Sequence, residues 1–452
     1  DQQWAFFPSV SGGWRVSEEA FWKVNPDLFS SLKIRASYGS LGNGNVSPYS
    51  FLELLSISTS GRVLNGLKNK YTSAPAVMPD GLTWETATTT DVGLDFGMLN
   101  NRLQFNGDYY IRKTTDMYTV GETLPDVFGA SSPKGNYADM TTKGWEITLT
   151  WRDQFTLAEK PFNYEIRGTL SDYISTIDRY NNQTGNLDDY YAGKRVGEIW
   201  GYVTEGLFKD QADIDSHADQ TLIQSSSKRI TYPGDVKIKD LNGDHVIDYG
   251  NNTVDDHGDK TVIGNALPRY AYSINLSGDW NNFFLSAFFQ GVGKQDWYPS
   301  SECIFWGQYN RPYNNMPTWH QGNYWTEDNT DAYLPRYAGY NASLKSTPQT
   351  RYLQNVAYIR LKNLQFGYTL PQPIVSKAKL QNVRVYISAE NLWCWSPLYK
   401  HTRDLDVTNI YGSDPDLTDA DMSSGLNGNR GSGDGNSYPQ MKSVSLGLSV
   451  TF

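Results

Sequence analysis

The stretch between residues 240 and 248 carries the pattern that most suggests ligand chemistry. Its oxygen donors follow the spacing of an EF-hand loop, the fourth of them through a backbone carbonyl: Asp240, Asn242, Asp244, Val246 and Asp248. Calcium takes about six to eight oxygen ligands, and closely spaced carboxylates repel one another without a cation between them. We therefore expect a structural Ca²⁺ or Mg²⁺ ion here, acting as a clip and not in catalysis.

Two departures from the EF-hand pattern leave an alternative open. His245 stands where a glycine normally permits the sharp turn, and position 12 of the loop is Asn251 where the pattern has an acid. The alternative is a polar turn in an exposed loop without a bound ion.

A second cluster is aromatic and lies between residues 303 and 325. Aromatic faces stack on the apolar faces of sugar rings, and nearby amides such as Gln321 and Asn323 can bond to hydroxyl groups. The residues expected to contact a substrate or a partner are Trp306, Tyr309, Trp319, Tyr324 and Trp325. The alternatives are a small hydrophobic core within the loop, or an aromatic belt at a membrane interface.

Catalysis finds little support in the sequence. The five histidines fall in regions expected to be loops, without an HExxH or GxSxG motif or a carboxylate pair around them. The glycine-rich stretch 425–435 lacks the following helix and the lysine of a phosphate-binding loop. We predict that the chain is not an enzyme and holds no catalytic cofactor.

The elements that must position these loops are β-strands, because apolar and polar residues alternate with a period of two. Trp145, Ile147 and Leu149 share one face of a strand, for example, while Glu146 and Thr148 share the other. The predicted strands cover about eleven segments, at residues 4–16, 32–38, 92–96, 103–111, 145–152, 162–170, 270–276, 283–291, 359–370, 382–391 and 443–452. The alternation changes phase within 359–370, which predicts a β-bulge near Lys362 and Asn363.

The connections between these strands alternate between short and long. Short or modest ones are predicted at 98–102, 153–161, 278–282 and 371–381, and long polar ones at 41–83, 113–141, 172–269, 292–355 and 392–440. A compact soluble domain seldom carries several structureless loops beyond about 12–15 residues, whereas outer-membrane barrels do. The polar strand faces also exclude a sandwich core, where they would be buried unpaired. The predicted fold is all-β, an antiparallel transmembrane β-barrel with long extracellular loops.

The composition of the chain excludes some classes of binding partner. The chain has 39 basic and 49 acidic residues, a net charge of −10, which argues against nucleic acid or anionic lipid headgroups as main partners. No segment approaches the ~18–20 consecutive apolar residues of a transmembrane helix. Single-chain bacterial barrels have even strand counts. An odd count, in a sequence that opens at Asp1 without a leader, leads us to expect the C-terminal part of a larger barrel.

Several sequence blocks together resemble the SusC/RagA-type TonB-dependent transporters of Bacteroidetes. They lie in the same order along the whole chain, at 32–44 (LKIRASYGSLGNG), 82–110, 196–208 (VGEIWGYVTEGLF), 234–248 (GDVKIKDLNGDHVID), 259–272, 283–291, 358–371 (YIRLKNLQFGYTLP), 383–392 and 438–452. Matching the segment 261–264 (TVIG) to the family also implies Asp259 as a further ligand of the acidic loop, displaced by an insertion at 249–258.

The resemblance implies an importer of oligosaccharides or peptides in the bacterial outer membrane. Such an importer would be capped by a SusD-like surface lipoprotein, energised through TonB–ExbB–ExbD and surrounded by outer-membrane lipid, and the resemblance further suggests a dimer of such pairs. Residues 1–452 would then be the C-terminal part of the transmembrane barrel, about half of a 22-stranded one, with the plug and N-terminal domains outside this chain. The alternative is a passive outer-membrane pore or an adhesin with ligand-binding loops.

Overall fold

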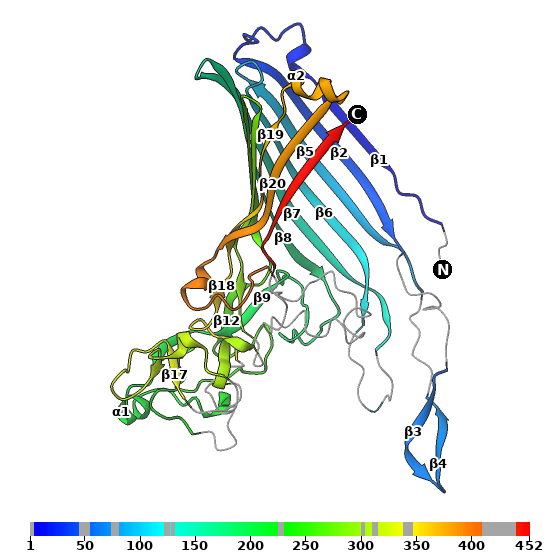
Figure 1. The fold of residues 1–452 in the computed structure, drawn as a ribbon. Helices are drawn as coiled ribbons and strands as arrows, with labels where there is room; N and C mark the ends of the chain where they lie inside the picture. Colours follow the sequence, from blue (N-terminus) through cyan, green and yellow to red (C-terminus); the bar gives the residue numbers. More distant parts are fainter. Residues whose placement is uncertain are drawn as a thin grey trace.

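One antiparallel sheet of eleven strands dominates the fold (Figure 1). The computed structural model describes residues 4–44, 55–73, 81–121, 127, 132–224, 230–299, 303–309, 315–337, 347–408 and 440–452. In spatial order the strands are β1 (Ser9–Trp14), β2 (Phe29–Asn43), β5 (Glu85–Met98), β6 (Leu103–Val120), β7 (Lys134–Leu157), β8 (Lys160–Arg179), β13 (Arg269–Trp280), β14 (Phe283–Lys294), β19 (Tyr358–Thr369), β20 (Asn382–Trp395) and β21 (Ser443–Thr451). All eleven predicted strands are present, and the predicted all-β fold is confirmed.

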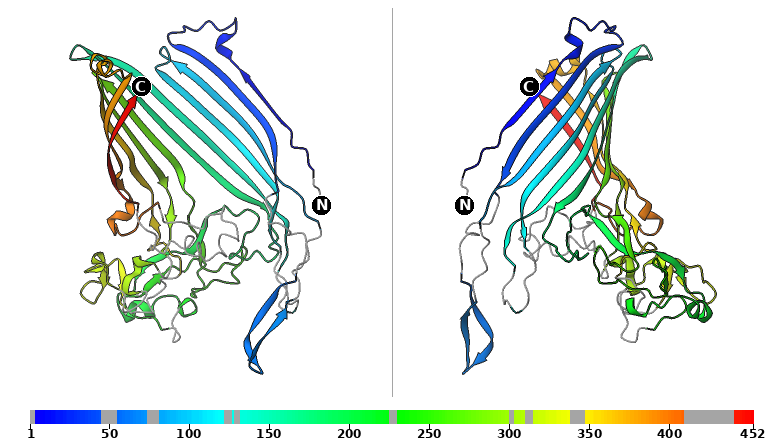
Figure 2. Two further views of the ribbon diagram at one scale, coloured as in Figure 1. Left: turned by 45° about the vertical axis from the view of Figure 1, so that its right-hand side comes forward. Right: turned by 180° about the vertical axis from the view of Figure 1, so that it is seen from behind.

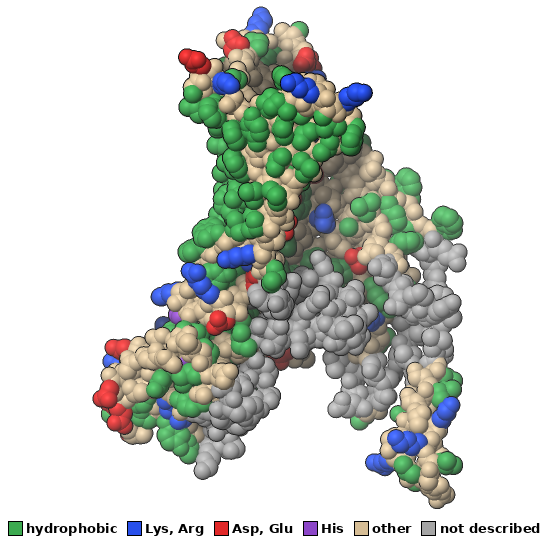
Figure 3. Space-filling view, in the orientation of Figure 1, with side chains coloured by type: hydrophobic (Ala, Val, Ile, Leu, Met, Phe, Trp, Pro, Cys, Tyr) green, Lys and Arg blue, Asp and Glu red, His purple; other side chains and the backbone are tan. Residues whose placement is uncertain are grey.

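The sheet curves like part of a barrel wall, with β1 and β21 as its two edges (Figures 1 and 2). Its convex face is apolar because the pairing keeps the alternating positions in register. Across four neighbouring strands, for example, one row contains Leu103, Trp151, Ile166 and Leu276. Figure 3 shows hydrophobic side chains as a band on the outer surface of the part of the sheet that faces the viewer, with charged side chains at the rim of the short turns.

The concave face carries the polar half of each strand. Thr148 on β7 lies opposite Asn106 on β6 and Thr169 on β8, one position along from the apolar Leu149. A sheet with these two faces can place its apolar side in lipid and its polar side in water. No helix in the described part of the chain is long and apolar enough to cross a membrane.

The predicted β-bulge is confirmed at Lys362. On β14, Phe288 pairs with Asn363 and the next residue, Phe289, pairs with Leu361, so Lys362 is the extra residue. The pairing of β19 with β20 shifts at the same place. The extra residue moves the apolar side chains of β19 from odd to even positions while keeping them on one face.

Most strands run further than the alternation predicted, and β2, β5, β6, β7 and β8 do so by eight or more residues. β6 continues to Val120, and β7 begins at Lys134, so most of the connection expected at 113–141 is strand. β7 and β8 meet in a tight turn at Ala158 and Glu159, both with positive φ, where a longer connection was expected. In the added end of β6, residues 113–116 are polar on both faces, which removes the hydrophobic signal while the backbone ladder continues.

The long connections gather at one end of the sheet and the short ones at the other (Figures 1 and 2). The short-turn end carries η1 (Val16–Glu18), α2 (Gln372–Val375) and η7 (Ser376–Ala378). We call the described parts of 180–268, 295–357 and 396–408 the loop cap. It contains β9 (Glu198–Tyr202), β10 (Thr204–Leu207), α1 (Gln211–Asp215), η3 (Thr221–Ile223), β11 (Val236–Ile238), β12 (Lys260–Asn265), β15 (Asp296–Trp297), η4 (Ile304–Tyr309), η5 (Thr318–His320), β16 (Tyr324–Trp325), β17 (Leu334–Arg336), β18 (Gln354–Asn355) and η8 (Pro397–Lys400). A separate hairpin, β3 (Ile57–Leu64) with β4 (Leu67–Thr72), projects at the same end.

The hydrophobic core of the protein lies in the loop cap and not in the sheet. Its residues come from all three connections and include Tyr202, Val236, Leu334, Tyr352 and Leu398, each at most 1% exposed. Short strand pairs such as β9 with β12 and β10 with β11 frame this core. The cap therefore has a packed hydrophobic core of its own, which the described strands of the sheet lack.

Candidate functional site

The acidic loop lies in the loop cap between β11 and β12. Asp240 caps its first turn, because its carboxylate accepts hydrogen bonds from the backbone N–H groups of Gly243 (2.6 Å) and His245 (2.9 Å). These bonds hold the pKa of Asp240 below its ordinary value. His245 adopts a left-handed backbone with φ of 66°, the conformation for which an EF-hand has glycine at this position.

The other predicted ligands make hydrogen bonds of the same kind within the loop. Asn242 and Asp244 are hydrogen-bonded to each other, and Asp244 also accepts the backbone N–H of Val246 (2.8 Å). The buried carboxylate of Asp259 accepts the N–H groups of Leu241 (2.7 Å) and Asp248 (3.0 Å), which joins the two ends of the loop. Asp259 thus lies beside this loop despite the intervening insertion.

A bound cation in this loop stays a prediction. Within the described ranges, no group of three or more His, Cys, Asp or Glu side chains is placed to hold a metal ion. The donor set nevertheless fits a hard cation, since a carboxylate offers about four acceptor positions and the backbone bonds leave some of them free.

The predicted aromatic residues divide into two groups. Trp306 and Tyr309 are 1% exposed, and their polar atoms are paired within the cap: Trp306 Nε1 donates to the carbonyl of Pro299 (3.3 Å) and the Tyr309 hydroxyl to that of Pro335 (2.7 Å). For these two residues the structure matches the alternative of a small core within the loop. A fully buried ring cannot touch a ligand unless the cap opens.

Trp319, Tyr324 and Trp325 keep part of their surface exposed. They pack against the same core from its edge, so each presents one side to solvent. The ring of Trp325 lies against Gly234, where an added Cβ would come within 2.5 Å of it. These three remain candidates for contact with a substrate or partner. Tyr313, a further aromatic residue of the cluster between 303 and 325, lies outside the described residues.

His320 belongs to the interior of the cap. It is fully buried, and its Nε2 is hydrogen-bonded to the carbonyl oxygen of Phe305 (2.9 Å). Burial lowers its pKa to about 4, so the ring is neutral at physiological pH. We infer that His320 stabilises the cap and does not take part in binding or catalysis.

The concave face of the sheet contains a charged network that the sequence analysis missed. The guanidinium of Arg35 on β2 bonds to Asp95 on β5 (Nε–Oδ2, 2.9 Å) and to Asp108 on β6 (Nη1–Oδ1, 2.8 Å). It reaches across Gly93, where an added Cβ would lie 2.4 Å from Asp108 Oδ1. The alternation of Asp91, Gly93 and Asp95 in the sequence carried this signal, but the partner strands were needed to interpret it.

Further polar pairs continue along the same wall. The hydroxyls of Thr169 and Ser273 are 2.6 Å apart, and Arg152 pairs with Glu165. Towards the loops, Arg179 bonds to Asp139 (2.7 Å) and Asp116 (3.0 Å). These half-exposed donors and acceptors form a hydrogen-bonding surface suited to polar molecules passing along it.

One buried ion pair joins the sheet to the loop cap. Arg360 on β19 and Asp406 in the connection after β20 are 2.6 Å apart, and both are almost fully buried. Gln440, just before β21, also accepts a hydrogen bond from Arg360 (2.6 Å). Since breaking a buried pair is costly, this contact fixes Asp406 and Gln440, at the two described ends of the last long connection, against β19.

Comparison with known proteins identifies relatives of the whole arrangement. Residues 1–392 match the family model described as TonB dependent receptor-like, beta-barrel. All of the chain aligns with TonB-dependent receptors P26 (27% identical, 43% of that protein) and P3 (29%, 42%) of Formosa agariphila, and with SusC of Bacteroides thetaiotaomicron (24%, 40%). The chain thus spans less than half the length of these curated relatives.

Solved structures show the same fold. A structure of the RagAB peptide transporter aligns with 87% of this chain and 40% of its own, at a TM-score of 0.65 and 20% identity. The RagAB peptide importer in the "closed-closed" state aligns with 99% of this chain and 44% of its own, at a TM-score of 0.68 and 18% identity.

Proposed function

This chain belongs to the family of TonB-dependent receptor-like β-barrels, and from that premise we propose that it forms about half of the barrel of a nutrient importer. The resemblance to SusC/RagA-type transporters is confirmed by the family match and by the relatives named SusC and RagAB. Membership in a family of receptors and transporters also confirms that the chain is not an enzyme. Outer-membrane nutrient import is the function that these relationships support.

The observation that carries the proposal is the two-sided sheet. Eleven strands with an apolar convex face and a polar concave face suit a wall between lipid and an aqueous path. Barrels of 22 strands are known among plugged outer-membrane transporters. We propose that residues 1–452 supply the C-terminal half of such a barrel, and that the plug and N-terminal domains belong to a preceding part of the protein.

We further propose that TonB–ExbB–ExbD energises transport, and that a SusD-like lipoprotein closes over the loop cap. The cargo would be oligosaccharides or peptides that pass along the concave wall. The three half-exposed aromatics of the cap support a contact with cargo or lipoprotein at its edge. Replacing Trp319 and Trp325 together with alanine is expected to lower uptake without lowering barrel yield.

A structural cation in the acidic loop is part of the same proposal. Asp240, Asn242, Asp244, Val246, Asp248 and Asp259 would hold it, and its role would be to fix the loop between β11 and β12. No step of transport depends on it.

Denaturing mass spectrometry of the complex purified from native membranes tests the proposal. The expected result is a polypeptide more than twice the 51.0 kDa of this chain, carrying a plug, together with a lipoprotein. A companion uptake assay should show loss of transport when TonB is removed. A complex without plug or lipoprotein, with uptake independent of TonB, would contradict the proposal and favour a passive pore or adhesin.

A further inference from the structure

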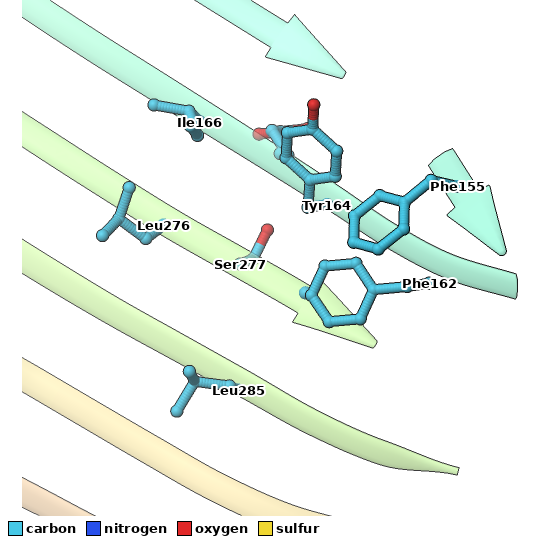
Figure 4. A pocket seen from close by; sticks show the side chains of 9 residues that line it. Phe155, Phe162, Tyr164, Ile166, Leu276, Ser277 and Leu285 are labelled. Carbon is cyan, nitrogen blue, oxygen red and sulfur yellow. The ribbon is translucent and has the colours of Figure 1, made fainter. Parts of the chain in front are cut away.

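A groove on the convex face lies near the short turns, far from the loop cap. Its volume is about 360 Å³, within the range of about 300–1,000 Å³ typical of small-molecule sites. Its walls are mostly apolar and come from β7, β8, β13 and β14: Phe155, Phe162, Tyr164, Ile166, Leu276 and Leu285. Glu165 and Ser277 also line it, although strand alternation directs their side chains to the concave face. Figure 4 shows the three aromatic rings gathered at one end of the groove and the aliphatic side chains around the other.

The groove exists because one position in an apolar row has no side chain. Gly278 on β13 lies between Tyr164 on β8 and Leu285 on β14 in the sheet register. The neighbouring rows are filled, by Ile166, Leu276 and Ala287 on one side and by aromatic residues at the rim on the other. An added Cβ on Gly278 would lie 3.3 Å from the Phe162 ring, so the ring closes one side of the gap.

The rim next to the groove suits a lipid headgroup. Strand alternation places Lys160 on the same face as Phe162 and Tyr164, at the first position of β8. Its ammonium group is exposed and bonds to Asn281 in the adjacent turn. Trp280 completes the rim and donates its indole N–H to the carbonyl of Leu157 (2.9 Å). Tryptophan and lysine are typical anchors at the membrane–water boundary.

We propose that this groove binds one acyl chain of a phospholipid whose phosphate lies against Lys160. The inference rests on the proposed placement of the sheet in the membrane. With the continuous apolar face in lipid, the groove on that face is open to lipid molecules. The leaflet next to the short turns would be the periplasmic one, which in an outer membrane consists of phospholipid. The groove holds the chain in a fixed position, unlike the flat apolar surface around it.

Native mass spectrometry of the full-length protein tests this site. The protein, stripped of lipid in dodecyl maltoside, is incubated with dioleoyl phosphatidylethanolamine, and retained lipid molecules are counted. Gly278→Leu fills the groove and is expected to lower retention of the first lipid roughly fivefold or more. Gly168→Leu is the matched control: it lies on the same face of β8, where an added Cβ meets nothing within 4 Å, and retention should not change.

Two further variants keep the test decisive. If Gly278→Leu does not fold, Leu285→Trp fills the same space from the neighbouring strand and is expected to have the same effect. Lys160→Gln should also weaken retention, because the phosphate loses its cation. Equal retention in the groove-filling variants and the control would overturn the site, and unchanged retention in Lys160→Gln would overturn the role of the phosphate.

The same protein preparations distinguish a failure of the lipid site from a failure of the importer proposal. Flotation with phosphatidylethanolamine vesicles reports whether the barrel inserts at all. A wild-type protein that does not insert contradicts the importer proposal and the lipid site together. A protein that inserts but loses no lipid when the groove is filled contradicts the lipid site alone.

Discussion

The sheet and the loop cap place the same kinds of side chain in opposite environments. In the sheet, large hydrophobic residues such as Leu446 (78% exposed) and Leu149 (46%) point away from the protein. In the cap, Leu334 and Tyr352 are fully buried. The hydrophobic effect drives apolar surface out of water in both regions, but only the cap can do so by folding on itself. The sheet needs lipid to complete its burial.

This difference decides which substitutions each region tolerates. A cap residue is stabilised by close packing against its neighbours, so its removal leaves a cavity. A residue on the convex face is stabilised by transfer into the membrane, so its replacement by a charge is the damaging change. Substitutions that act in one region and not in the other therefore test this difference between the sheet and the cap.

The largest effect is expected in the cap core. Trp306→Ala removes a ring whose centroid lies 5.2 Å from those of Phe305 and Tyr352, and should destabilise the cap by about 3–5 kcal/mol. Limited proteolysis of the folded full-length protein measures this as faster cleavage within the cap. Trp393→Ala is the control on the convex face, where the ring is half exposed, and it should leave cap cleavage unchanged. Equal cleavage in both variants would contradict a packed cap.

The next effect is expected on the convex face of the sheet. Leu149→Arg places a charge towards the middle of the bilayer and should lower the free energy of unfolding by about 2–4 kcal/mol. Its neighbour Thr148 faces the concave side, so Thr148→Arg should cost less than about 1 kcal/mol. Urea unfolding in phospholipid vesicles measures both. The assignment of the two faces fails if the penalties are equal or reversed.

Low pH should lower the stability of the cap, because protonation of His320 favours the unfolded state. The unfolded residue takes up a proton below about pH 6.5, but the buried ring does so only near pH 4. The contribution of neutral His320 to the free energy of unfolding is therefore complete above pH 6.5. It is lost as the pH falls towards 4, by up to about 3 kcal/mol. Proteolysis of the cap across this range measures the loss. His320→Gln should remove most of the dependence, and a profile identical to that of the wild type would show that another group is responsible.

The smallest effect is expected at the acidic loop. Asp244→Ala removes a predicted ligand and a turn-forming hydrogen bond, and should raise protease sensitivity between β11 and β12 without changing global stability by more than about 0.5 kcal/mol. A chelator should reproduce the effect in the wild type and add nothing in the variant. If neither the substitution nor the chelator changes cleavage, the cation is absent and the loop is a polar turn.

The sequence predicted the sheet well because lipid and water impose a strict period of two. Even the bulge at Lys362 was visible, as a change of phase between Leu361 and Leu364. The cap was not predictable in the same way, because its core joins residues such as Trp297, Tyr352 and Leu398 from separate connections without periodicity. That Trp306 is buried and Trp319 half exposed depends on these long-range contacts, which a local pattern does not contain.

The most direct test of the account is a scan of residues 145–151 on β7 with spin labels in lipid vesicles. The full-length protein is used, with Cys303, Cys394 and any other cysteine replaced. Labels at 145, 147, 149 and 151 should collide with oxygen dissolved in lipid, and labels at 146, 148 and 150 with a water-soluble nickel complex. A label at residue 244 in the cap should meet only the nickel complex. Loss of the alternation, or equal access to both reagents, would contradict a wall between lipid and an aqueous path.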